Sequence, residues 1–288
     1  MLPDQHSGER RAGTNQPQRT SWGQDITPLN VDVLSRALRG HRIGWPLYYV
    51  ERVSSTQDVA RKLAQERAAE GVLVLAEEQT AGRGRAGRSW WAPAGTAILS
   101  SLLLRPSLAP QHLGYLGMIA GLAVVDALRS VGSIPSLLKW PNDILVQGKK
   151  VAGILVEIMW TGEKVQAVIL GVGINVRAHI PANLPFAREA ISLLDAGFDV
   201  SREDLVIAYV RAFEAYYDRV LKGWSPVRLW ARHLHTLGKR VRVVDSHGTW
   251  EGMAEDVSED GALLVRQGTE VRVLRAADVR VRTVEEGL

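Results

Sequence analysis

The sequence predicts an α+β protein in which a mixed, largely antiparallel sheet with packed helices precedes a small C-terminal β-barrel. Short apolar runs separated by proline and glycine turns fill residues 135–176, as in an antiparallel meander. Residues 113–132 are apolar on most faces and long enough for a buried helix. After Gly238, apolar and polar residues alternate in runs of about five, which predicts the barrel.

Length and composition indicate the domain organisation. At 288 residues the chain is long enough for one large domain and one small domain. Hydrophobic residues make up 46% and charged residues 23%, so the chain can bury a core. We expect a disordered extension at 1–28, which is polar and rich in turn formers, a main domain at 29–237, and the barrel at 238–288.

The first two helices are expected behind capping residues. Asn30 is placed to cap a helix that Gly40 ends. Ser54, Ser55 or Thr56 can cap the next helix, in which Val, Ala and Leu side chains recur on one face.

Three more helices are expected further along the chain. The buried helix at 113–132 ends at Gly132. Ser201 and Asp204 frame the start of a helix through 205–221, and residues 225–238 supply one more.

A stretch of glycine and arginine lies between two expected core strands, at 71–79 and 96–106. The antiparallel meander follows the central helix, with strands expected at 135–140, 143–147, 150–160 and 165–176.

Bulk properties and missing motifs exclude several classes of protein. The net charge of +4 comes from 35 basic against 31 acidic residues, a milder balance than in most dedicated nucleic-acid binders. With no cysteine, thiolate chemistry and disulfides are excluded, and a reducing cytoplasm is the expected location. No signal peptide is visible, and we expect no apolar run that approaches the ~20 residues of a membrane span.

Common nucleotide-binding and hydrolase motifs are also missing. There is no Walker loop, "GVGINV" has valine in place of the third glycine of a dinucleotide fingerprint, and no G-x-S-x-G elbow occurs. His233 and His235 are spaced i,i+2, which on a helix directs them to different sides.

The stretch "EEQTAGRGRAGRSWW" at 77–91 is the first candidate for chemistry. Its glycines allow close backbone approach to an anion, and Arg83, Arg85 and Arg88 offer bidentate donors. An RNA-binding patch or a solvated turn would explain the loop alone equally well. Trp90 and Trp91 follow, and adjacent residues of a strand point to opposite sides, so one can be core and the other can shield a ligand.

Further candidates lie at strand ends and turns. Lys139 ends a strand before a proline turn, where it is either a functional cation or a surface lysine. Lys150 precedes a small Ala152-Gly153 pair, which suits ligand approach or a bulge. Asn175 is available for a sugar or ureido contact, and Asp143 for Mg²⁺, although turn roles explain both.

Taken in order, these stretches resemble the biotin protein ligases over nearly all of residues 30–285. The motifs that carry the resemblance are "SSTQDVA", "EEQTAGRGRAGRSW", "LLLRP", "KWPNDILVQGKKVAGILVE" and "GVGINV". The resemblance implies the class II synthetase-like biotin–lipoate ligase fold with an SH3-like C-terminal barrel. It also implies that biotin and Mg²⁺-ATP form biotinyl-5′-AMP, and that a lysine of a biotin carboxyl carrier protein domain then attacks this anhydride.

The resemblance also assigns roles to residues of this chain. It implies catalytic roles, through charge stabilisation rather than base or nucleophilic catalysis, for Lys139 and Arg85. Biotin contacts are implied for Ser55, Thr56, Gln57, Gln79, Arg83, Gly84, Arg85, Lys139 and Gly153. Nucleotide contacts are implied for Arg83, Arg85, Arg88, Trp90, Lys139, Asn142, Lys150 and Asn175. Metal ligands are not indicated.

Two departures from the family pattern stand out. The family often has asparagine where this chain has Gln57, which bears on a direct biotin contact there. Only about 28 residues precede the first helix, so we expect no DNA-binding winged helix and no repression. The sequence leaves the oligomeric state open, a homodimer included, and predicts no membrane partner. Lipoate ligases and an RNA-binding module are the competing interpretations.

Overall fold

A seven-stranded sheet forms the centre of the molecule. The computed structural model describes residues 18–19, 25–246, 248–275 and 280–284. The strands run in the order β3-β4-β5-β9-β8-β7-β6, and every neighbouring pair is antiparallel except β3 and β4. Their bounds are β3 (Leu47–Val53), β4 (Leu73–Gln79), β5 (Ala97–Leu104), β6 (Leu137–Lys139), β7 (Asp143–Val146), β8 (Lys149–Thr161) and β9 (Lys164–Asn175). The predicted mixed, largely antiparallel sheet is confirmed.

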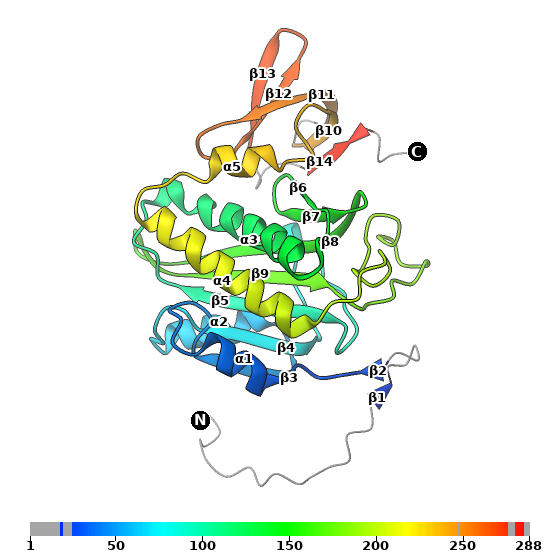
Figure 1. The fold of residues 1–288 in the computed structure, drawn as a ribbon. Coiled ribbons are helices and arrows are strands. Elements are labelled where there is room, and N and C mark those ends of the chain that lie inside the picture. The colour runs from blue at the N-terminus through cyan, green and yellow to red at the C-terminus, as the bar shows by residue number, and fades with distance from the viewer. Residues whose placement is uncertain (1–17, 20–24, 247, 276–279, 285–288) are drawn as a thin grey trace.

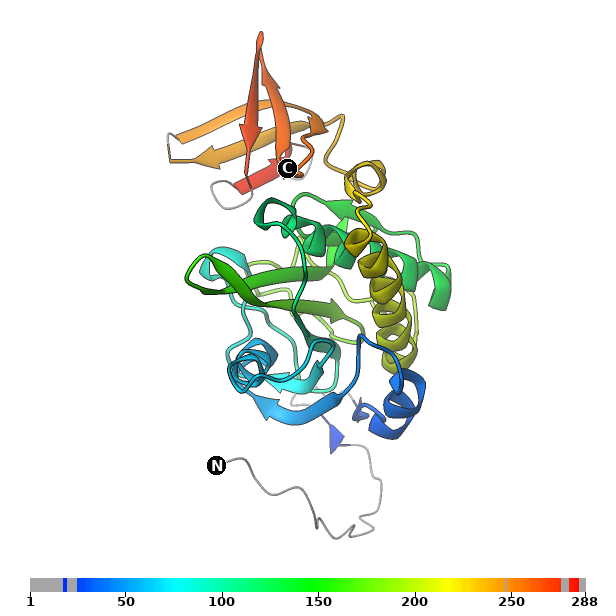
Figure 2. The same ribbon diagram turned by 90° about the vertical axis from the view of Figure 1, so that its left-hand side faces the viewer.

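Helices cover both faces of this sheet (Figures 1 and 2). One face carries α1 (Val31–Leu38), α3 (Gly114–Gly132) and α4 (Arg202–Leu221), and α5 (Val227–Arg232) continues this layer. The opposite face carries α2 (Thr56–Gln65), which packs on β4, β5 and β9. The sheet therefore has two cores, a large one under α3 and α4 and a small one under α2.

Helix α3 is the central packing helix, as its sequence predicted. It is long and apolar enough for a membrane span, so the expectation that no apolar run reaches that length was wrong. However, 67% of its apolar window is buried inside the protein, as in the core helix of a globular fold. The helix ends at Gly132, and the left-handed C-cap residue is Ser133, with φ of 49°.

Three predicted helix caps are confirmed by hydrogen bonds. The side chains of Asn30, Ser55 and Ser201 accept from the backbone N–H groups of Val33, Gln57 and Asp204 respectively. The cap of α2 fixes the backbone of the S-S-T-Q motif where this helix begins, on the sheet face that α2 covers.

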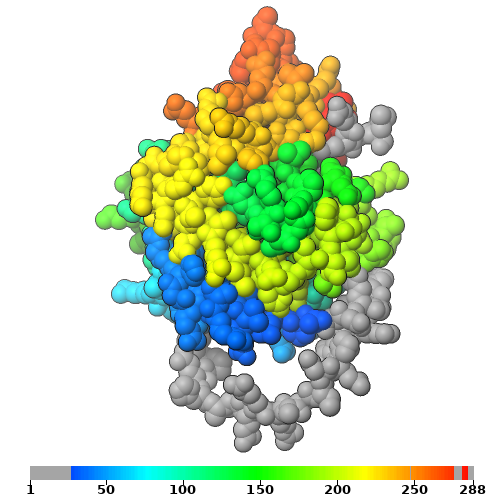
Figure 3. Space-filling model, in the orientation of Figure 1, coloured from blue at the N-terminus to red at the C-terminus, as the bar shows by residue number. Residues whose placement is uncertain are grey.

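The C-terminal strands form a separate five-stranded sheet in the order β13-β12-β11-β10-β14. Their bounds are β10 (Arg240–Asp245), β11 (Gly248–Val257), β12 (Leu263–Gln267), β13 (Glu270–Leu274) and β14 (Arg280–Thr283). Within the described ranges the edge strands β13 and β14 do not pair, and the antiparallel arrangement agrees with the small all-β C-terminal domain that was expected. It lies against the larger body, where Trp140 Nε1 donates to the carbonyl of Gly261 at 3.1 Å (Figure 3).

Part of the expected N-terminal extension is structured. Strands β1 (Gln18–Arg19) and β2 (Asp25–Ile26) pair in an antiparallel arrangement, and most of the remainder lies outside the described residues. A buried ion pair holds the segment that follows. Arg202 Nη1 bonds Glu77 Oε2 at 2.8 Å, and Arg202 Nη2 donates to the carbonyl of Thr27 at 2.6 Å. Glu77 Oε1 in turn accepts from the backbone N–H of Leu29 at 2.6 Å.

We expect Arg202→Ala to destabilise the fold by about 3–5 kcal/mol, because it leaves the buried Glu77 carboxylate without its counter-ion. Urea unfolding followed by circular dichroism measures this change. Arg177→Ala is the matched control, since the Arg177–Asp199 pair is exposed and should contribute less than about 1 kcal/mol. Equal losses in the two variants would show that the Arg202 network is dispensable.

Candidate active site

The sheet face under α2 contains a strip without side chains. In β9, Gly171, Gly173 and Asn175 alternate along the strand and therefore share one face. Gly173 pairs with Gly153 of β8, and the same cross-strand row continues through Asp143 of β7 to Lys139 of β6. Residues of the K-W-P-N-D-I-L-V-Q-G-K-K-V-A-G-I-L-V-E motif and of the G-V-G-I-N-V motif thus meet in one row.

The indole of Trp90 lies on this strip. A Cβ built on Gly173 would lie 2.7 Å from Trp90 Cε2, and one on Gly153 would lie 3.0 Å from Trp90 Cζ3. Only glycine at both positions allows this approach. Lys150 Nζ lies 5.5 Å from the centroid of the same indole and pairs with Asp143 Oδ1 at 2.6 Å. Trp90 and Trp91 do not belong to a strand, so the expected alternation of the two side chains does not apply.

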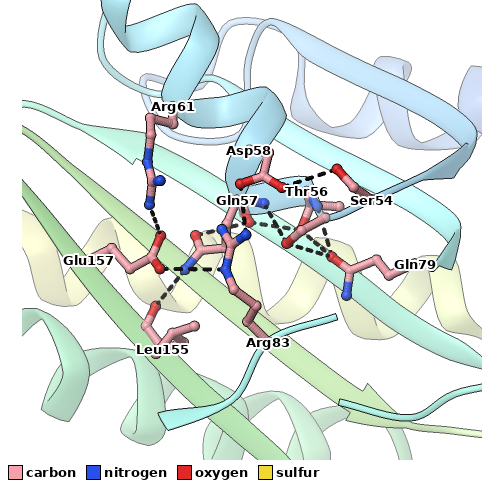
Figure 4. Close-up of polar contacts among 11 residues, drawn as sticks. Ser54, Thr56, Gln57, Asp58, Arg61, Gln79, Arg83, Leu155 and Glu157 are labelled. Carbon is pink, nitrogen blue, oxygen red and sulfur yellow. Dashed lines mark hydrogen bonds and ion pairs between the residues drawn. The ribbon is translucent and has the colours of Figure 1, made fainter. Parts of the chain in front are cut away.

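A polar floor lies where α2 begins (Figure 4). Gln79, at the end of β4, accepts through Oε1 from the backbone N–H of Thr56 at 2.8 Å and from Thr56 Oγ1 at 3.0 Å. Ser55 Oγ, which caps α2, donates to the same oxygen at 3.4 Å. Ser55, Thr56 and Gln79, all predicted biotin contacts, are therefore brought together.

Ser101 of β5 extends this floor and was missed by sequence reasoning. Its hydroxyl lies 2.8 Å from Thr56 Oγ1 and 3.2 Å from Gln57 Oε1. Gln57 is almost fully buried, and its amide carbon lies 3.2 Å from a Cβ built on Gly171. Ser101 stands in the same cross-strand row as Gly171, a relation that the strand pairing alone reveals. Ser100 and Ser101 are adjacent in an otherwise apolar strand, and the sequence gave no other signal that distinguishes Ser101.

The floor holds more acceptor oxygens than hydrogens. Thr56 and Ser101 have two hydroxyl hydrogens between them, but three close oxygen–oxygen contacts link them to each other and to the two glutamines. With the Gln57 amide oxygen toward Ser101, one of these contacts has no hydrogen of its own. This surface is therefore suited to a ligand that donates hydrogen bonds.

The glycine-arginine stretch folds as an ordered hairpin between β4 and β5. Trp90 N–H donates to the carbonyl of Gly82 at 2.8 Å, and Gly84 N–H donates to that of Arg88 at 2.6 Å. A short turn, η1 (Arg85–Gly87), closes the hairpin, with Ala86 in the left-handed region at φ 54°. The predicted position of the loop between two strands of the main sheet is confirmed.

The loop arginines contact different parts of the fold. Arg83 forms an ion pair through Nη1 with Asp58 Oδ1 at 2.8 Å. Arg85 Nη1 donates to Asn142 Oδ1 at 3.1 Å, and Asn142 is itself held through its Nδ2 donor by the carbonyl of Ile154. Burial lowers the pKa of the Arg85 guanidinium, and the positive charge of Arg88 lowers it further. An anion placed here would relieve that repulsion.

Lys139 ends β6 as predicted, but β6 is an edge strand rather than a core strand. The chain just after it is fixed on both sides. Trp140 is buried, its backbone N–H donates to Thr236 Oγ1 at 3.0 Å, and its indole bonds the carbonyl of Gly261. His233 and His235 follow α5 and flank β6 by backbone bonds to Leu138, so they form no pair on a helix.

Asn175 occupies the far end of the glycine strip. It is buried, its Nδ2 donates to the carbonyl of Ile191 at 3.3 Å, and its Oδ1 has no hydrogen-bond partner among the described residues. That enclosed acceptor would gain from a polar group of a ligand.

The described residues contain no group of three or more His, Asp or Glu side chains arranged to hold a metal ion. A separate hollow between the end of α3 and the β6–β7 hairpin is lined by Arg129, Leu137 and His235, among others. None of the predicted site residues lines that hollow.

Comparisons with known proteins first identify the class. Residues 49–175 match the model of the Biotin/lipoate A/B protein ligase family, and residues 236–282 match that of the Biotin protein ligase C terminal domain. The segment 49–175 contains the polar floor, the arginine loop and the glycine strip.

Individual relatives narrow the class. The chain is 36% identical over 266 residues to the biotin–[acetyl-CoA-carboxylase] ligase of Mycobacterium tuberculosis, covering 88% of this chain and 95% of that protein. It is 35% identical over 249 residues to the bifunctional ligase/repressor BirA of Bacillus subtilis, covering 85% and 76%. The biotin protein ligase from Aquifex aeolicus in complex with biotin and ATP superposes with a TM-score of 0.71 at 27% identity, covering 82% and 98%. The chain belongs to the biotin protein ligase family.

We expect Gly173→Ala to displace the Trp90 indole, because the new Cβ would lie 2.7 Å from Cε2. Overpacking of this kind costs about 1–3 kcal/mol. The indole N–H signal of Trp90 in the ¹H–¹⁵N spectrum is identified as the one that disappears in Trp90→Phe. This signal should shift in Gly173→Ala. Gly117→Ala is the control, since its Cβ would make an ordinary 3.4 Å contact with Val156. An unmoved Trp90 signal in Gly173→Ala would contradict the proposed close packing.

Proposed function

We propose that this chain activates biotin with ATP to form biotinyl-5′-AMP and pyrophosphate, and then transfers biotin to a lysine of a carboxylase carrier domain. In the first step a carboxylate oxygen of biotin bonds to the α-phosphorus and pyrophosphate leaves. In the second step the acceptor amine attacks the acyl carbon, AMP leaves and the amine loses a proton. Membership of the family and the relatives crystallised with biotin and ATP support the reaction.

The observation that carries the choice of biotin is the polar floor. A ureido ring has two N–H donors and one carbonyl acceptor, whereas the floor has surplus acceptors in Thr56, Ser101 and Gln79. A ureido N–H would donate to one of these oxygens and so satisfy an acceptor that the hydroxyl hydrogens cannot reach. The ring would lie beside the Trp90 indole, which itself covers Gly153 and Gly173.

The same floor opposes lipoate, the acid of the sister enzymes. A dithiolane ring has no N–H donor, so the buried oxygens would stay unsatisfied after desolvation. Such a group costs about 1–3 kcal/mol, and sites built to bond a substrate N–H discriminate strongly against analogues without it.

The cations around the glycine strip are proposed to act on the anionic end. Lys139 and Arg85 would bring the biotin carboxylate and the α-phosphate together and stabilise the charge that develops in transfer. Trp90 and Lys150 lie over the strip at Gly153 and Gly173, beside which we place the adenosine. Asn142 would orient Arg85 through the bond at 3.1 Å.

The remaining contacts complete the proposal. Gly84 and Gly153 would allow close ligand approach, and Arg88 and Asn175 would contact the nucleotide. Mg²⁺ would be held chiefly by the phosphate oxygens of ATP, the usual arrangement for this ion. The absence of cysteine accords with a cytoplasmic location.

Mass spectrometry after mixing the purified chain with Mg²⁺-ATP and either biotin or lipoate tests this function. Biotinyl-adenylate alone is the expected product. Lipoyl-adenylate would place the protein with the lipoate ligases, and formation of neither adenylate would refute acid activation.

We expect Lys139→Ala to lower the rate of biotinyl-adenylate formation about 100-fold or more, the usual loss of a donor aimed at developing charge. Pyrophosphate release measures the rate, and the melting temperature reports the fold. Lys149→Ala, which removes an exposed lysine of the same motif, should leave the rate unchanged. Full activity of Lys139→Ala would remove Lys139 from the mechanism.

Arg85→Gly tests the other proposed cation. It should leave a folded enzyme that still forms the adenylate but releases it, since the loop loses its bond to Asn142. Biotin on lysines of a bystander protein such as albumin, detected by streptavidin blotting, measures this release. A labelling pattern equal to that of the wild type would show that Arg85 does not retain the intermediate.

A further inference from the structure

Arg83 is held between two carboxylates that belong to neither the loop nor the predicted site. We propose that Asp58 and Glu157 are positioning residues that clasp Arg83 and so keep the arginine loop closed over the polar floor. The inference rests on the proposed function, because its purpose is to retain the acyl-adenylate.

The two carboxylates come from elements on either side of the floor. Asp58 stands in the first turn of α2, and its Oδ1 lies 2.8 Å from Arg83 Nη1. Glu157 stands on β8, and its Oε1 lies 3.7 Å from Arg83 Nε. Figure 4 shows the Arg83 side chain reaching between them.

The clasp lies directly beside the buried floor. Asp58 follows Gln57 in α2, and Glu157 is two residues from Leu155 on the same face of β8. Gln57 and Leu155 are themselves in contact, since Gln57 Nε2 donates to the Leu155 carbonyl at 3.5 Å. Arg83 therefore bridges α2 and β8, the same two elements that the Gln57–Leu155 contact joins.

Both carboxylates are oriented by second partners. Arg61 Nη2 donates to Glu157 Oε2 at 2.7 Å, and Ser54 Oγ donates to Asp58 Oδ2 at 3.0 Å. Each carboxylate thus has one oxygen fixed by its own neighbourhood and the other available to Arg83. A clasp of oriented partners loses less side-chain entropy on closing than one of free side chains.

The clasp does not use every N–H donor of the Arg83 guanidinium. Arg83 Nη2 is enclosed and makes no hydrogen bond among the described residues, whereas Nε faces Glu157 Oε1 at 3.7 Å, beyond hydrogen-bond distance. The Nη2 donor remains for an acceptor atom of the ligand. The same side chain can therefore link the loop, the two flanking elements and the bound molecule.

The strength of the clasp should depend on salt. The side chains of Arg83, Asp58 and Glu157, and that of Arg61, which supports Glu157, are 25–40% exposed. Their ion pairs are therefore screened at high ionic strength. A pair of this exposure contributes at most about a fivefold change in an equilibrium. Opening should therefore rise about two- to fivefold when one carboxylate is neutralised.

Two readouts test the clasp in Asp58→Asn, Glu157→Gln and the double variant. The first is the ratio of bystander biotinylation to biotinyl-adenylate formed. The second is the rate of tryptic cleavage at Arg83, Arg85 and Arg88 in the enzyme without ligands, which reports loop opening. We expect both to rise two- to fivefold in the single variants and about tenfold in the double variant, while adenylate formation changes less.

Controls separate positioning from a general loss of stability. Asp58→Glu and Glu157→Asp keep the charge and should restore most of the wild-type behaviour. Asp218→Asn removes a partly exposed carboxylate that pairs with Arg42 on the helical face, and it should change neither readout. Salt at 1 M should raise loop cleavage in the wild type but not in the double variant.

The outcomes distinguish the clasp from the reaction. Unchanged loop cleavage and leakage in the double variant, or equal effects in Asp218→Asn, would overturn the clasp. A wild type that forms no biotinyl-adenylate would refute the proposed function, and loop cleavage would still decide whether Asp58 and Glu157 hold Arg83.

Discussion

The close approach of side chains to the bare strip of the sheet is the constraint on which the site depends. Gly153, Gly171 and Gly173 leave the backbone of β8 and β9 uncovered, and Trp90 and Gln57 lie directly on it. Any Cβ in the middle of this strip would push the indole and the arginine loop away from the sheet. A flat surface of this kind gives a planar ring maximal contact, while the polar groups at its border set the orientation.

Polar and charged residues divide the border of the strip into two ends. Hydroxyl and amide oxygens from α2, β4 and β5 gather at one end, and they are enclosed enough that unmet hydrogen bonds are costly. The Arg85 guanidinium and the ammonium groups of β6 and β8 gather at the other end, where burial already lowers the pKa of Arg85. A ligand with a donor-rich head and an anionic tail matches this division.

The elements with strong local signals could be predicted from the sequence, whereas features set by strand pairing could not. Capping residues and periodicity located α1, α2 and α4, and the two flanking apolar runs placed the arginine loop between strands. Strand β3 was not expected, because it is a half-exposed edge strand without clear alternation. The role of Ser101 depends on the register of β5 against β9, because a shift of one residue would turn its side chain to the other face of the sheet. The C-terminal strands were expected, but their alternation carries no information on whether the sheet closes.

In the proposed complex one acid lies along the strip with its head on the polar floor and its activated end among the cations. A crystal structure with biotin and a non-hydrolysable ATP analogue is the most direct test. The ureido ring should lie within hydrogen-bond distance of Thr56, Ser101 and Gln79, and the α-phosphate beside Arg85 and Lys139. A biotin bound elsewhere, for example in the hollow lined by Leu137 and His235, would contradict this arrangement.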